Sequence, residues 1–178
     1  MKIYLTILIV LFISCNNKPD TKKMSYLYDG KETGLDSLLD LSGEFLTPNH
    51  AHHIVFYRDG LIAYPEMRPD RNFYTDEIWK TRIWTKYIWG KYIVEGKNII
   101  KVQRFEDDGV FGSGPIKFIE ETFRIVSPEK ILMIESTHFA TPREFVFSRV
   151  DNRPDSLDCW LLKEDWFMNT IKKDSEIN

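Results

Sequence analysis

The chain is poor in cysteine, has no excess of basic charge and contains no long apolar run in its body. Its 2 cysteines are too few for a small disulfide-stapled scaffold. Its 24 lysines and arginines stand against 27 aspartates and glutamates, so the net charge of −3 gives no basic field for phosphate groups. We therefore expect no nucleic acid partner. What is present, 43% apolar and 14% aromatic residues, is enough for one domain with a sizeable core.

The N-terminus has the features of an export signal. After a positive start, residues 3–13 form an apolar run that is about half of the roughly 20 residues needed to span a bilayer. The run predicts a lipoprotein signal peptide over residues 1–14. The following sequence, Phe12-Ile13-Ser14-Cys15, resembles the lipobox of bacterial lipoproteins, with Phe12 where leucine is usual.

The lipobox resemblance implies that Cys15 is acylated and becomes the mature N-terminus. Acyl chains, at about 0.8 kcal/mol per buried CH₂, would hold the protein on a membrane. Asn16 stands where an acidic residue would resemble an inner-membrane retention signal, so we favour the outer membrane of a bacterial cell envelope. Residues 15–37 are mostly polar and predict a lipidated cysteine followed by a flexible tether.

From Gly43 onward, the apolar residues alternate with a period of two, which is typical of antiparallel strands. Asp59-Gly60 lies between two such runs and predicts a hairpin, because both turn positions favour a positive φ. Further runs cover residues 83–94, 99–105, 117–126, 131–136 and 145–150. They predict a mainly β domain over residues 38–178, an antiparallel meander of about 8–9 strands that closes into a barrel and thereby hides its edges.

The period changes to that of a helix after the last strand. Pro154-Asp155-Ser156 is a typical helix start, and apolar residues including Trp160 and Leu161 then recur at helical spacing. One amphipathic C-terminal α-helix over about residues 155–172 is predicted to pack on the sheet.

Several segments together resemble small bacterial lipocalin-like lipoproteins. They are Trp89-Gly90-Lys91-Tyr92-Ile93-Val94-Glu95-Gly96, the strand at 99–102, the turn at 123–128 and the closing strand at 145–150. Leu41-Ser42-Gly43-Glu44-Phe45 is similar to the Gly-x-aromatic opening of lipocalins, with Phe45 in place of the usual tryptophan. The resemblance covers about residues 38–151. It implies a lipocalin-like barrel able to hold a small apolar ligand, and it transfers no site residues.

Aromatic residues supply the candidate ligand contacts. They are Trp84, Tyr87, Trp89 and Tyr92, together with Phe111 at the tip of a glycine-rich loop. Such side chains line small-molecule sites. They also fill cores, so core packing is the alternative interpretation.

Histidines supply the candidate metal ligands. His50, His52 and His53 lie close together, and His138 is the remaining histidine of the chain. In an extended segment, His50 and His52 would share a face while His53 points away. The alternative is a polar loop that enters a strand.

The chain carries no recognisable catalytic motif. The sequence G-x-S-x-G is absent, and Glu120 and Glu121, as neighbours on a strand, would point to opposite faces. We expect a non-enzymatic, lipid-anchored envelope protein, without a cofactor, that carries a small apolar ligand or a partner protein. The alternative is a periplasmic metal-binding protein that uses the histidines. A hydrolase with a dispersed site is a third hypothesis.

Overall fold

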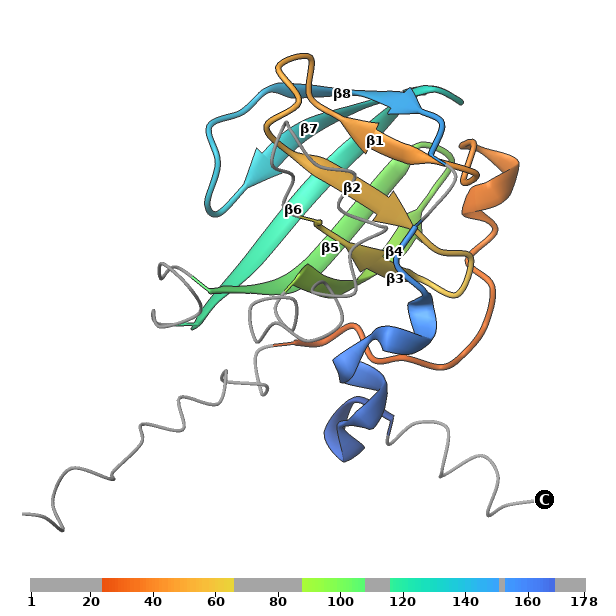
Figure 1. Ribbon diagram of the computed structural model, residues 1–178, viewed down its shortest axis with the longest axis vertical. Coiled ribbons are helices and arrows are strands. Elements are labelled where there is room, and N and C mark those ends of the chain that lie inside the picture. The colour runs from red at the N-terminus through yellow and green to blue at the C-terminus, as the bar shows by residue number, and fades with distance from the viewer. Residues whose placement is uncertain (1–23, 66–87, 108–115, 151–152, 169–178) are drawn as a thin grey trace, which may run out of the picture.

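Eight antiparallel strands close into a barrel in the computed structural model, which describes residues 24–65, 88–107, 116–150 and 153–168 (Figure 1). The strands are β1 (Glu44–Leu46), β2 (His53–Phe56), β3 (Leu61–Ala63), β4 (Trp89–Glu95), β5 (Ile99–Asp107), β6 (Ile116–Ser127), β7 (Lys130–Ser136) and β8 (Arg143–Ser148). Each pairs with the next along the chain, and β8 returns to pair with β1. The predicted mainly β fold and its closure are confirmed, and the barrel is compatible with a lipocalin-like fold.

Two glycine turns, of which the first was predicted, show why the meander folds where it does. Gly60 joins β2 to β3 with φ 85°, and Gly96 joins β4 to β5 with φ 65°. Such angles are accessible to glycine because it has no Cβ. The Asp59 side chain adds a local bond, since its Oδ1 accepts a hydrogen bond from the Leu61 N–H at 3.2 Å.

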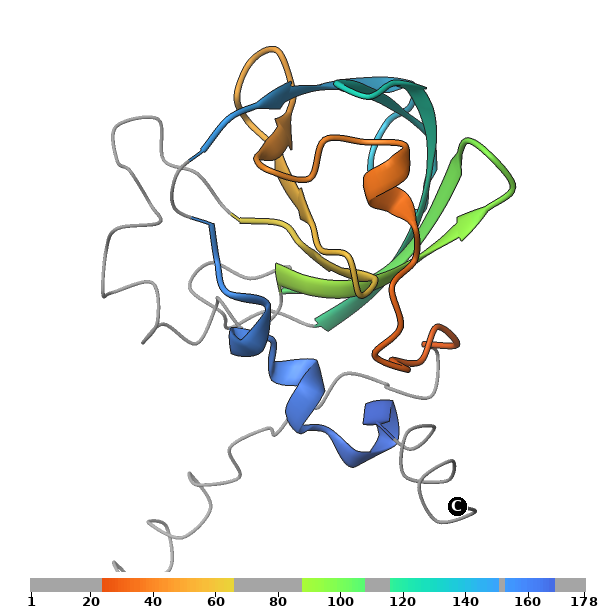
Figure 2. The same ribbon diagram turned by 90° about the vertical axis from the view of Figure 1, so that its right-hand side faces the viewer.

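Inward-facing side chains fill the part of the barrel next to the N-terminal 3₁₀ helix η3 (Leu35–Ser37), which lies over one end of the barrel (Figure 2). Five large aromatic side chains dominate this filling, and each is at most 1% exposed: Phe45, Phe56, Tyr92, Phe123 and Phe145. The ring of Phe56 meets that of Tyr92 edge-on, with centroids 5.3 Å apart. This aromatic cluster is a packed core.

A second apolar cluster lies on the outer wall of β2 to β5. Strand residues including Trp89 and Phe105 are covered there by Leu161 and Phe167 from the C-terminal segment. That segment runs along the outside of the barrel in both views (Figures 1 and 2).

The C-terminal helix is shorter than predicted. Two 3₁₀ helices, η7 (Ser156–Asp158) and η8 (Trp160–Lys163), precede a helical turn at 165–168. Extended backbone at Cys159 and Glu164, with ψ 115° and 113°, separates these pieces. The breaks let the segment follow the curved outer wall, which one straight helix starting near residue 155 could not do. Residues 169–172 of the predicted helix lie outside the described residues.

The predicted tether needs a correction in its described part. Residues 24–37 pack on the barrel: Met24 is 4% exposed and Leu35 is fully buried. The N–H groups of Ser25 and Tyr26 donate to Gln103 Oε1 at 2.7 and 3.0 Å. Few apolar residues occur in this segment, and its docking depends on these few together with backbone hydrogen bonds. Cys15 and the signal peptide lie outside the described residues.

Within those residues, no helix is long and apolar enough to cross a membrane.

Candidate functional site

The inner face of the barrel changes from apolar to polar with distance from η3. At the opposite end, here called the distal end, lie the connections 47–52 and 137–142. Aromatic filling gives way there to charged and polar side chains that come from several strands and connections and that surround one phenylalanine. They are His52, Tyr64, Arg104, Glu106, Glu121, His138 and Arg143, with Phe139 among them, and we call all eight the distal cluster.

A buried ion pair forms the base of the distal cluster. The Arg104 side chain is 3% exposed and that of Glu121 is fully buried. Arg104 donates from Nε to Glu121 Oε2 and from Nη2 to Oε1, both at 3.3 Å, and its Nη1 lies 2.6 Å from Glu106 Oε2. Burial acts to lower the pKa of Arg104, but the neighbouring carboxylates outweigh it, so the pKa is raised and the guanidinium stays charged.

Tyr64 and Gly90 fix the position of this pair. The Tyr64 ring lies 4.1 Å from the Arg104 guanidinium carbon, and its hydroxyl donates to Glu121 Oε2. Burial and the charge of Glu121 raise the tyrosine pKa well above its ordinary value, so the hydroxyl keeps its proton. Gly90 pairs with Arg104 across β4 and β5, and a Cβ there would come 2.6 Å from the Cβ of Arg104. Glycine thus leaves room for the arginine.

Phe139 connects the remaining members of the distal cluster. The guanidinium carbon of Arg143 lies 4.6 Å from the Phe139 ring centroid. The rings of His52 and His138 lie 5.0 and 4.6 Å from the same ring. Burial, followed by the charges of Arg143 and Arg104, lowers the pKa of His52 below its ordinary value. His52 is therefore uncharged at neutral pH.

The four histidines do not form one group. His53 sits on the outer wall, where its Nδ1 lies 3.0 Å from Glu44 Oε2 and its Nε2 lies 3.1 Å from the His50 carbonyl. His50 is exposed, with φ 55°, whereas His52 and His138 both contact Phe139 at the distal end. Among the described residues, no three His, Cys, Asp or Glu side chains are grouped so that they could hold a metal ion. The geometry gives the metal hypothesis no support.

The aromatic ligand candidates do not form one group either. Trp89 is 2% exposed in the outer-wall cluster, and Tyr92 is fully buried in the aromatic cluster, where its hydroxyl donates to the Tyr57 carbonyl at 2.6 Å. Both are core residues, which was the alternative interpretation. Trp84, Tyr87 and Phe111 lie outside the described residues.

Sequence reasoning missed the distal cluster, although one signal was readable. Ile100, Val102 and Arg104 occupy alternating positions of β5, so the apolar inward face ends in a charge. An arginine on an inward-facing position needs a buried partner. The partner, Glu121, was interpreted only as a neighbour of Glu120.

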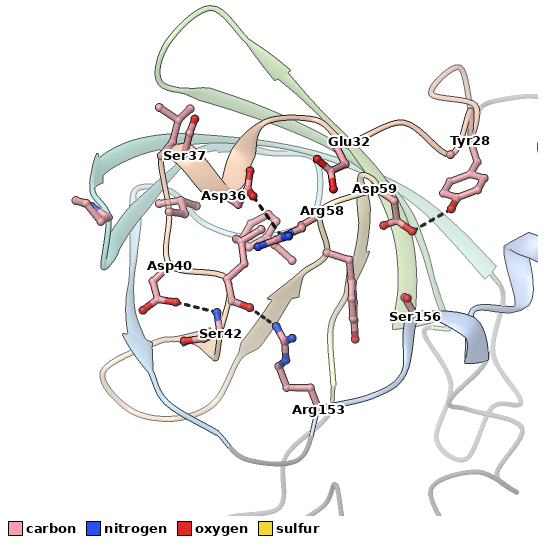
Figure 3. A pocket seen from close by; sticks show the side chains of 17 residues that line it. Tyr28, Glu32, Asp36, Ser37, Asp40, Ser42, Arg58, Asp59, Arg153 and Ser156 are labelled. Atoms are coloured by element: carbon pink, nitrogen blue, oxygen red, sulfur yellow. Dashed lines mark hydrogen bonds and ion pairs between the residues drawn. The ribbon is translucent and has the colours of Figure 1, made fainter.

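A groove of about 1010 Å³ lies beside η3, away from the distal cluster (Figure 3). Most of its charged side chains are engaged with their own surroundings. Asp36 pairs with Arg58 at 3.3 Å, and Asp59 accepts from the Tyr28 hydroxyl at 3.0 Å. Arg153 donates to the Leu41 carbonyl. These contacts hold the N-terminal segment on the barrel, so we assign the groove a structural role.

Comparison of the chain with protein-family models, with curated proteins and with solved structures found no match. The function must therefore be argued from the geometry of the barrel and of its distal cluster.

Proposed function

We propose that the protein is a lipid-anchored protein of the bacterial cell envelope that binds a small ligand at the distal end of its barrel. The observation that carries this proposal is the buried Arg104–Glu121 pair. Removing two charges from water costs several kcal/mol per ion, and well-packed apolar residues often serve stability equally well. The same barrel uses such apolar filling next to η3. The buried ion pair on the inner face of the other half is best explained by a role in ligand recognition.

The ligand expected from the sequence was apolar, and the structure favours an amphipathic one. The aromatic cluster already fills the interior next to η3, so a ligand has to bind near the distal end. There it meets guanidinium, carboxylate and hydroxyl groups together with the Phe139 ring. A few polar groups set in apolar surroundings are typical of small-molecule sites.

A non-enzymatic binding role agrees with the surroundings of Cys159 and of Glu120 and Glu121. Cys159 is buried in the outer-wall cluster, where burial raises the pKa of its thiol to about 12. A thiol held in that form is a poor nucleophile. Glu120 and Glu121 are directed to different surroundings, since Glu120 accepts from Gln103 Nε2 at 2.9 Å while Glu121 pairs with Arg104.

Membrane attachment rests on the sequence of the N-terminus, in particular on Cys15. We expect Cys15→Ser to remove the acyl chains and to shift the protein out of the outer-membrane fraction. Mass spectrometry of the N-terminal peptide and fractionation of the envelope test this. An unacylated Cys15 in the wild-type protein would contradict the anchor and leave the binding site untouched.

Native mass spectrometry of the full-length protein, purified in detergent from its own envelope, tests ligand binding. We expect a co-purifying mass of a few hundred daltons that is lost on denaturation. The double variant Arg104→Met, Glu121→Leu should lose this mass. The matched control is Glu95→Leu, Lys101→Met, which removes an exposed ion pair of 2.8 Å. A bare wild-type protein, or a ligand retained by the first variant, would refute the proposal.

A further inference from the structure

Arg143 is a second guanidinium on the inner face of the distal end. It begins β8 and pairs with Met133 of β7, a buried core residue, and Phe145 follows on the same face. Its guanidinium carbon lies over the Phe139 ring at 4.6 Å. Within the described part of the chain, its Nη1 is buried and has no hydrogen-bond partner.

The nearby carboxylates are engaged elsewhere. Glu121 accepts hydrogen bonds from Arg104 and Tyr64. Glu106 pairs by charge: its Oε2, which is buried without a hydrogen-bond partner, lies 2.6 Å from Arg104 Nη1, and its Oε1 lies 3.5 Å from His138 Nε2. Glu144, which follows Arg143 in sequence, pairs with Lys130 at 2.7 Å. Attraction across a longer distance does not satisfy an N–H donor, because a hydrogen bond needs an acceptor within about 3.5 Å.

A buried guanidinium N–H without an acceptor is costly, and native proteins rarely keep one without a reason. The guanidinium fork matches the oxygen atoms of carboxylate, phosphate and sulfonate groups, to which it donates charge-assisted hydrogen bonds. Packing against Phe139 holds the fork in place, so less side-chain entropy is lost when an anion binds.

We infer that the ligand carries an oxyanion group that binds Arg143, with Phe139 beside it. This inference rests on the proposed function and names the chemical class of the ligand. Arg104 already pairs with Glu121 and Glu106, whereas Arg143 pairs with no carboxylate of the described residues and contributes the cation that receives the anion.

Two soluble probes that share a naphthalene ring, one carrying an anionic and one a neutral sulfonyl group, test the inference. They are naphthalene-2-sulfonate and naphthalene-2-sulfonamide, titrated calorimetrically into the full-length protein in a non-ionic detergent, with the detergent alone as blank. We expect the wild-type protein to bind the sulfonate at least about tenfold more tightly than the sulfonamide. Arg143→Met should abolish this preference. Arg124→Met removes the same charge from an exposed position of β6 and should retain it.

Arg143→Lys keeps a positive charge without the fork, and it provides a second test if Arg143→Met fails to fold. We expect it to bind the sulfonate about three- to tenfold more weakly than the wild type while its affinity for the sulfonamide stays unchanged. Far-UV circular dichroism reports whether each variant is folded.

Equal affinity for the two probes in the wild type, or a preference that survives in Arg143→Met, would overturn the inference and leave the proposed function standing. A co-purified ligand without an acidic group would overturn it as well. Fragmentation of that ligand tells a lipid headgroup, with its acyl chains, from a free organic anion, and either supports the inference. A wild-type protein that carries no ligand and binds neither probe would refute both proposals.

Discussion

The two halves of the barrel interior are built on the same strands but are filled in opposite ways. Next to η3, aromatic side chains interlock, and Phe56 and Phe123 lie with ring centroids 6.5 Å apart. At the distal end, Arg104 and Glu121 form an ion pair that is almost as completely buried as those rings, with side chains 3% and 0% exposed. Burial of apolar side chains stabilises the fold because it removes them from water. Burial of a charge is destabilising unless the interaction with its partner offsets the loss of hydration.

Under the proposed function, this difference means that stability and recognition are divided along the barrel axis. The aromatic side chains that fill the half next to η3 are each at most 1% exposed, so they are not accessible to a ligand. The distal half contains hydrogen-bond donors and acceptors in excess of what packing requires. Substitutions in the two halves should therefore separate loss of folding from loss of binding.

The largest expected effect belongs to the aromatic half. Phe123→Ala should lower the free energy of unfolding by about 3–5 kcal/mol, because it leaves a cavity among rings that cannot close in. Urea unfolding followed by tryptophan fluorescence measures this. Val126→Ala, at a position of β6 that is 54% exposed, is the control and should change stability by less than about 0.5 kcal/mol. A loss below about 1 kcal/mol for Phe123→Ala would mean that the interior is loosely packed.

The next effect concerns the ion pair. Glu121→Leu should cost about 3 kcal/mol, because Arg104 stays buried with only Glu106 as its carboxylate partner. The double variant Arg104→Met, Glu121→Leu should recover most of that stability, since apolar residues replace both charges. Urea unfolding of the two variants gives the comparison. If the double variant is no more stable than Glu121→Leu, the pair is a structural requirement of the distal half, and the division of roles is wrong.

The smallest effect is a pH dependence at His52. Its pKa is lowered in the folded protein, so below about pH 6.5 the unfolded chain binds more protons and stability falls. His52→Gln removes this contribution, and its melting temperature should fall less than that of the wild type between about pH 7 and pH 5. Between about pH 7 and pH 9 the histidine does not titrate, so the melting temperatures of the two proteins should change with pH by the same amount. Identical slopes in the acid range would show that His52 is not desolvated.

Much of the fold followed from local pattern. Alternation of apolar residues indicated the strands, and Asp59-Gly60 marked a turn that the structure shows, with Gly60 at φ 85°. The same rules failed for residues 24–37, because a segment with few apolar side chains resembles a tether even when each of them is buried. They also made the C-terminal helix too long, since helical periodicity carries no information about the curvature of the wall that the segment covers.

The sequence by itself determined the fold class and the order of the strands, because period-two alternation and turn geometry act over a few residues. Closure of the meander was predicted from the need to hide the edge strands. Only the tertiary structure decided the site. Tyr64 meets Glu121 across 57 positions, and Arg104 meets Glu121 across 17, so no local pattern links them. The register of the strands in the closed barrel decides which inward-facing charges lie at the same height along the barrel axis. That register is complete only when the whole chain has folded.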